Sequence, residues 1–140
     1  VLMQATVIHC SGGATASPLD VAPTPTTGTG VTPSVTSGTL AQADEIVVQM
    51  NSHTGTDLLT MVEDVVDGFS EANQNLDNDD GQCFEAQYKV VVATTTLVVE
   101  ATYNASRAWG AILASFKGAV AATKAPPPVR RPWRFFRRAG

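Results

Sequence analysis

Residues 88–102 read YKVVVATTTLVVEAT, and the fold depends on whether this stretch is helix or strand. Its β-branched residues favour strand by intrinsic propensity. However, apolar or small residues recur at steps of three or four from Phe84 to Ala119, with no proline or turn cluster between them. A single strand of about fifteen residues would also be unusually long. We therefore predict helix over residues 85–123, with strand as the alternative for Tyr88–Thr102.

A second helical pattern lies upstream of this stretch. Steps of four and three residues connect Leu58, Val62, Val65, Phe69, Ala72 and Leu76. Residues 40–50 keep the same rhythm, and Gly55 interrupts it, so we favour two helices in line. The run DNDDG at Asp77–Gly81 predicts a turn, because Asn, Asp and Gly tolerate left-handed backbone. The predicted fold is therefore mainly α, an antiparallel helical hairpin or a small bundle.

A hairpin of this kind predicts assembly. Two helices of about 60 Å, at ~1.5 Å per residue, would leave half of each apolar seam exposed unless another molecule covered it. The residues expected to form this packing seam are Leu58, Val62, Val65, Phe69, Val91, Val98, Ile112 and Phe116.

Composition divides the chain into three parts. Residues 1–39 are expected to form an extended arm, since positions 11–39 are dominated by Gly, Ser, Thr and Pro, with Asp20 as their one charge. Residues 40–124 are the expected helical domain, and residues 125–140 are an extended Pro/Arg/aromatic tail. An ordered core confined to the middle part would be marginal on its own, which again favours partners.

The net charge of −4 conceals an asymmetry. Residues 1–124 contain four basic and thirteen acidic residues, hence −9, and the tail contains five arginines, hence +5. Arginines and aromatic rings alternate in this tail, so its expected interaction residues are Arg130, Arg131, Trp133, Arg134, Phe135, Phe136, Arg137 and Arg138. We rank protein partners or copies of the chain first as its target, a membrane surface second and nucleic acid third.

No residue set nominates a catalytic, cofactor or metal site. His9 and His53 are the two histidines, and the acidic turn fits a calcium loop poorly, with Leu76 and Gln87 at ligand positions. We therefore expect no enzyme activity, no cofactor and no bound metal.

The two cysteines, Cys10 and Cys83, are candidates for one disulfide, and two unpaired thiols are an equal alternative. A bridge would close a loop of about 70 residues, worth about 3–4 kcal/mol by loop entropy. The sequence does not determine the compartment, and we favour an extracellular location or a place in a large particle. It also does not determine whether Asn104 or the Thr-rich arm carries a glycan.

These observations predict a non-catalytic structural or assembly subunit that makes protein–protein contacts within a larger complex, capsid or filament. The alternative is a secreted binding protein whose basic aromatic tail engages membranes or other polyanions.

Overall fold

The computed structural model describes residues 7–54, 61–62, 67–77 and 82–119, and their regular structure is β-strand. The predicted helical hairpin is therefore wrong. No helix in the described ranges is long and apolar enough to span a membrane. The strands are β1 (Thr24–Gly30), β2 (Ser34–Thr36), β3 (Glu45–Thr54), β4 (Met61–Val62), β5 (Ser70–Asp77), β6 (Gln82–Val91), β7 (Val98–Glu100), β8 (Thr102–Tyr103) and β9 (Arg107–Lys117).

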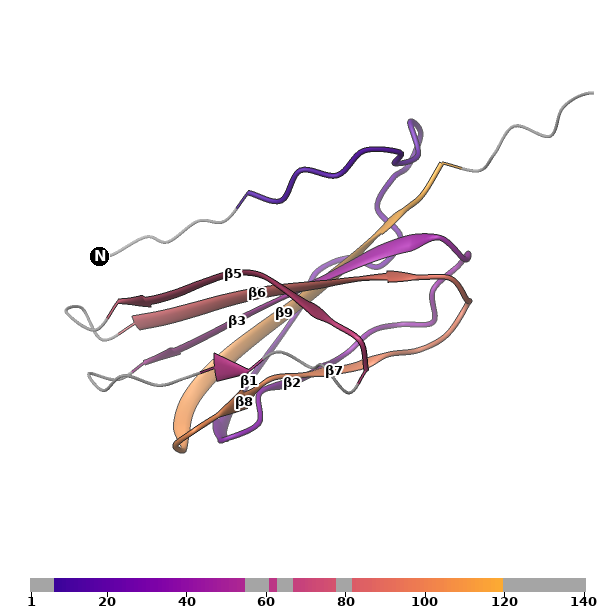
Figure 1. Cartoon of the computed structure of the whole chain (residues 1–140). Helices are drawn as coiled ribbons and strands as arrows, with labels where there is room; N and C mark the ends of the chain where they lie inside the picture. The colour runs from indigo at the N-terminus through magenta and orange to yellow at the C-terminus, as the bar shows by residue number, and fades with distance from the viewer. Residues whose placement is uncertain (1–6, 55–60, 63–66, 78–81, 120–140) are drawn as a thin grey trace, which may run out of the picture.

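The strands pair antiparallel in two layers. One layer is a five-stranded sheet in the order β1-β9-β3-β6-β5, and two short ladders pair β2 with β7 and β4 with β8. Figure 1 shows β2, β7 and β8 on one side of the five-stranded sheet. We call the side of the large sheet that faces β2 and β7 the inner face, and the opposite side the outer face.

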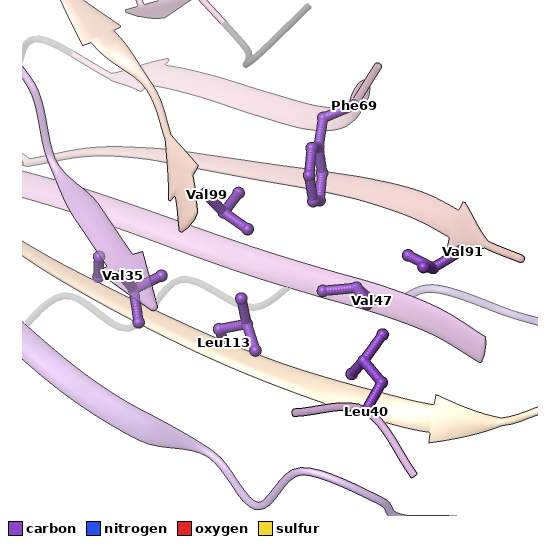
Figure 2. Close-up of a cluster of buried hydrophobic side chains, with 8 residues drawn as sticks. Val35, Leu40, Val47, Phe69, Val91, Val99 and Leu113 are labelled. Carbon is purple, nitrogen blue, oxygen red and sulfur yellow. The ribbon is translucent and has the colours of Figure 1, made fainter. Parts of the chain in front are cut away.

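The apolar core lies between the two layers. Val35 of β2 and Val99 of β7 come from one layer, and Val47 of β3 and Leu113 of β9 come from the other (Figure 2). The cluster is completed by Leu40, Phe69, Val91 and Ala111. Each fully buried aliphatic side chain contributes about 1.5–3 kcal/mol to folding, so this cluster is the main apolar link between the layers.

The stretch that we predicted to be helix follows its β propensity instead. β6 ends at Val91, residues 92–97 connect the layers, and the chain continues as β7 and β8. The objection that one strand would be too long therefore does not apply, because two layers share the stretch. Further on, the expected helix over residues 103–123 is replaced by β9, in which Ala111, Leu113 and Ser115 are buried and the residues between them are less buried. The burial of side chains in this segment therefore alternates with a period of two, which is the period of a β-strand.

The Thr/Pro/Gly-rich residues 7–39 are hydrogen-bonded to the sandwich and contribute two of its strands. β1 is the edge strand beside β9, and β2 belongs to the second layer. Between Gly12 and Val21 the chain pairs with the end of β9: the Ala14 N–H donates to the Lys117 carbonyl at 2.9 Å, and the Ser115 N–H donates to the Val21 carbonyl at 3.2 Å. These bonds offset the entropy cost of ordering a segment with few apolar side chains.

Candidate functional site

The outer face of the five-stranded sheet presents regular rows of apolar side chains. In β3 the odd-numbered residues from Glu45 to His53 are buried toward the inner face, and the even-numbered residues point outward. The registers of β6 and β9 against β3 align their outward residues with these. In the order β6, β3, β9, the rows are Val90–Ile46–Phe116, Tyr88–Val48–Ala114, Ala86–Met50–Ile112 and Phe84–Ser52–Gly110.

No residue of these four rows is charged, and several remain in contact with water. Val90 is 60% exposed and Phe116 is 38% exposed, with the half-buried Ile46 between them. A solvated sheet face normally carries polar side chains. An uncharged apolar face of this extent is typical of a surface that another molecule covers.

Two neighbouring cavities hollow the outer face, and together we call them the groove. The first, about 570 Å³, lies over the ends of β1, β9, β3 and β6 that include Pro25, Ala108, Thr54 and Phe84. The second, about 530 Å³, lies over Val48, Ala114 and Phe116. Met50 and Ile112 line both cavities, so the two cavities adjoin each other on the sheet. Each volume is in the range of ordinary ligand pockets.

The segment Ile8–Cys10 forms one wall of the second cavity. Figure 1 shows this part of the chain on the side of the sheet opposite β2, β7 and β8. Shortly after this segment, the chain is held to the end of the sheet by the Ala119 N–H, which donates to the Gly12 carbonyl at 2.7 Å. Cys10 is a free, exposed cysteine beside the groove.

A buried polar network lies on the inner face, directly beneath the groove. Gln49 and Asn51 exchange two side-chain hydrogen bonds, of 2.8 and 3.0 Å. The Gln87 amide donates to Gln49 Oε1, and also to the Glu100 carbonyl at 2.9 Å. Asn51 donates to Glu85 Oε2 at 3.4 Å. Because Glu100 is in β7, this network fixes the position of one layer against the other.

His53 ends the row of buried polar residues on β3. It is 2% exposed, and its ring meets the Tyr103 ring edge-on with 4.9 Å between centroids. Burial lowers the pKa of His53 below its usual 6.5, and the positive charge of Arg107 lowers it further, against an opposing effect of the Thr54 backbone. A neutral imidazole shielded in this way acts as a packing residue.

Asp20 connects three segments at the other end of the sheet. Its carboxylate accepts the Ala41 N–H at 2.8 Å and pairs with Lys117 Nζ at 3.1 Å. The Ala41 N–H lowers the pKa of Asp20 most, burial opposes this effect, and Lys117 adds to the lowering. The ion pair ties the segment before β1 to the end of β9.

Both edges of the five-stranded sheet carry features that hinder pairing with another strand. β5 is polar (SEANQNLD) and has a bulge between Glu71 and Asn73. β1 contains Pro25, and the Trp109 ring lies against Gly28 so closely that a Cβ there would be 2.5 Å from it. Proline, polar residues and bulges protect sheet edges, so the outer face is the better contact surface.

The structure separates the residues of the predicted packing seam. Phe69 and Val91 are in the core, while Ile112 and Phe116 are on the outer face. Val98 belongs to β7 and is 49% exposed. Val62 is in β4, but its side chain is outside the described part. Leu58 and Val65 also lie outside the described residues. The same is true of the predicted interaction residues of the tail, Arg130, Arg131, Trp133, Arg134, Phe135, Phe136, Arg137 and Arg138.

The disulfide stays a prediction. Cys10 is free in the structure, and the side chain of Cys83, on β6, is outside the described part.

Ile46, Val48 and Tyr88 are surface residues of the outer face that were not among the residues predicted for contact. The available signal for β3 was the alternation in residues 48–51, where Val48 and Met50 occupy even positions and the polar Gln49 and Asn51 occupy odd ones.

Among the described residues, no three His, Cys, Asp or Glu side chains gather in a way that would hold a metal ion. Comparison of the chain with family models, with curated proteins and with solved structures finds no match.

Proposed function

We propose that the protein is a non-catalytic structural or assembly subunit, and that it contacts other protein molecules through the outer face of its five-stranded sheet. The observation that carries it is the set of four uncharged rows from β6, β3 and β9, with Val90 and Phe116 still exposed.

Burial of this face against a partner is physically favourable. Apolar area removed from water contributes about 25 cal/mol per Å², and the face has no charge whose desolvation would oppose contact. The centres of protein interfaces are likewise depleted of charged residues. A copy of the same face is a suitable partner, because two sheets pack well at about 10 Å.

Charge favours this face for contacts between copies. Residues 1–124 carry −9, so most surfaces of two copies repel one another. The outer-face rows contribute nothing to that repulsion. The tail, with +5, is a second contact that we propose for the acidic surface of a neighbour.

Two matched valines test the proposal. Val90 is exposed on the outer face, and Val98 is similarly exposed on the second layer. In sedimentation velocity over micromolar concentrations, we expect the unmodified chain to self-associate, Val90→Glu to weaken association at least tenfold, and Val98→Glu to leave it unchanged. A wild-type chain that stays monomeric throughout, or loss of association in Val98→Glu alone, would contradict the proposal. Thermal unfolding of both variants checks that each remains folded.

A further inference from the structure

The bend between β8 and β9 contains an asparagine followed two residues later by a serine. Asn104-Ala105-Ser106 is the only Asn-X-Ser/Thr triplet in the sequence, and its middle residue is not proline. This is the acceptor pattern for N-linked glycosylation. The structure places the triplet after β8 ends at Tyr103 and before β9 begins at Arg107. It therefore lies in a connection between strands, where a bulky substituent interrupts no strand pairing.

Contacts on both sides hold this bend in place. The Tyr103 N–H donates to the Val31 carbonyl at 2.7 Å, and the Tyr103 side chain is only 2% exposed. After the bend, Arg107 pairs with Gly30 of β1, and its Nη1 donates to the Ser106 carbonyl at 3.4 Å. Because the chain is fixed before and after the triplet, the direction of the Asn104 side chain is set by its neighbours.

That direction is toward water. Thr102 is exposed, Tyr103 is buried and Asn104 is exposed, which is the alternation of an extended chain. Ser106 is exposed as well. A glycan is large and hydrated, so the folded chain can carry one only on an exposed side chain. Both residues that the acceptor pattern requires meet this condition.

The bend is also distant from the exposed apolar row of the outer face. Figure 1 shows the chain passing from β8 into β9 at one end of the sandwich. Phe116 follows Arg107 by nine residues along β9, a distance of about 30 Å at ~3.3 Å per residue. A glycan attached at the bend would therefore leave the row Val90–Ile46–Phe116 uncovered.

We propose that Asn104 is the acceptor of an N-linked glycan in the chain that passes through a secretory pathway. The donor is an oligosaccharide joined through pyrophosphate to a membrane lipid. The Asn104 Nδ2 forms a bond to the anomeric carbon of the first sugar, and the bond from that carbon to the pyrophosphate oxygen breaks. Nδ2 gives up one proton, and the lipid pyrophosphate is the leaving group. This inference does not depend on the proposed function.

Expression of the full chain behind a secretion signal in eukaryotic cells tests the proposal. Secreted and retained chains are both measured by intact mass before and after treatment with peptide N-glycosidase, and peptide mapping locates the modified asparagine. Most of the chain should carry a glycan at position 104. Asn104→Gln should abolish it, Ser106→Ala should lower the glycosylated fraction at least tenfold, and the matched control Ser106→Thr should retain it.

The mass measurement decides between two results. A glycan at position 104 that depends on the residue at position 106 supports the proposal. A chain that enters the pathway and keeps an unmodified Asn104 would overturn it, and so would a glycan that persists at full level in Ser106→Ala.

Thermal unfolding tests whether the folded bend presents Asn104 to water. The acceptor pattern can be modified before folding is complete, so a glycan alone does not establish where the side chain points. Since surface changes have small effects on stability, the glycosylated chain should unfold within about 3 °C of Asn104→Gln. A glycosylated chain that unfolds well below that variant would overturn the exposed placement. The proposed function is judged separately by Val90→Glu, so either proposal can fail without the other.

Discussion

At the scale of single residues, the interior is unusual because polar side chains are buried on the inner face of the sheet, at its central strand β3. Gln49, Asn51 and Gln87 satisfy one another there, and Asn51 reaches Glu85. A hydrogen bond between neutral groups adds only about 1 kcal/mol, but a buried group left without its partner costs about 1–3 kcal/mol. The network therefore penalises any arrangement of the strands that separates its members.

Replacing Gln49 by methionine should destabilise the fold by about 2–4 kcal/mol, because the amides of Asn51 and Gln87 each lose one of their acceptors. The free energy of unfolding in urea measures this. Ser52→Ala, on the exposed outer side of the same strand, should change it by about 0.5 kcal/mol or less. Equal losses in the two variants would show that the network does not contribute as described.

The histidine on the same strand should make stability depend on pH. Folding lowers the pKa of His53 below 6.5, so the unfolded chain binds a proton that the folded chain does not. The contribution is complete above pH 6.5 and is lost as the pH falls from 6.5 through the lower folded pKa. His53→Gln should flatten this part of a pH–stability curve. An unchanged slope in His53→Gln would contradict the argument.

At the scale of elements, the residue before β3 is held to the residue after β9 by close backbone contact. The Gly118 N–H donates to the Asp44 carbonyl at 2.7 Å, and a Cβ on Gly118 would lie 2.2 Å from that oxygen. Gly13, its bridge partner, has only one atom near a Cβ, at 3.9 Å. The two glycines of one bridge therefore differ sharply in the space around them.

Gly118→Ala should cost about 1–3 kcal/mol, because the backbone must shift to admit the methyl group. Gly13→Ala should be nearly neutral. Denaturant unfolding of both variants checks this difference, and a Gly118→Ala protein as stable as Gly13→Ala would show that the contact is loose.

The elements also show how far the sequence could predict the fold. The β-branched content of Tyr88–Thr102 correctly indicated strand, but helical spacing outweighed it in our prediction. In β3 the apolar residues Ile46, Val48 and Met50 face outward, and Gln49, Asn51 and His53 face inward. Apart from the buried Val47, residues 46–51 alternate with a period of two, but with apolar residues outward and polar residues inward, the reverse of an ordinary solvated sheet. The turn predicted at Asp77–Gly81 falls between β5 and β6, although most of it is outside the described residues.

The outer face could not be found from the sequence for a related reason. Its rows combine residues from β6, β3 and β9, which are separated along the chain by tens of residues. Only the register brings Val90 next to Ile46, and Ile46 next to Phe116. Ile112 and Phe116 were selected as contact residues from a helical pattern, and the strand places both on this face.

At the scale of the whole molecule, two different forces can hold copies together. The outer face contributes apolar contact, and the body and tail, with −9 and +5, contribute attraction between opposite charges. Salt distinguishes them, because screening shortens the Debye length from about 10 Å at 0.1 M to about 3 Å at 1 M. Apolar contact persists at high salt.

We expect self-association of the full chain to weaken severalfold between low and high sodium chloride concentrations, without being abolished. Sedimentation equilibrium at a series of salt concentrations measures the association constant. Complete loss of association at high salt would assign the contact to the charged tail in place of the outer face.

Photo-crosslinking from single positions tests most directly whether the outer face touches another protein molecule. A photoreactive phenylalanine analogue replaces Phe116 on the outer face, or Val98 on the second layer, and the crosslinked peptides are identified by mass spectrometry. If the outer face is the contact surface, we expect crosslinks from position 116 to residues of β3, β6 or β9 in a second chain. We expect few crosslinks from position 98. Crosslinks between chains from position 98 alone would contradict it.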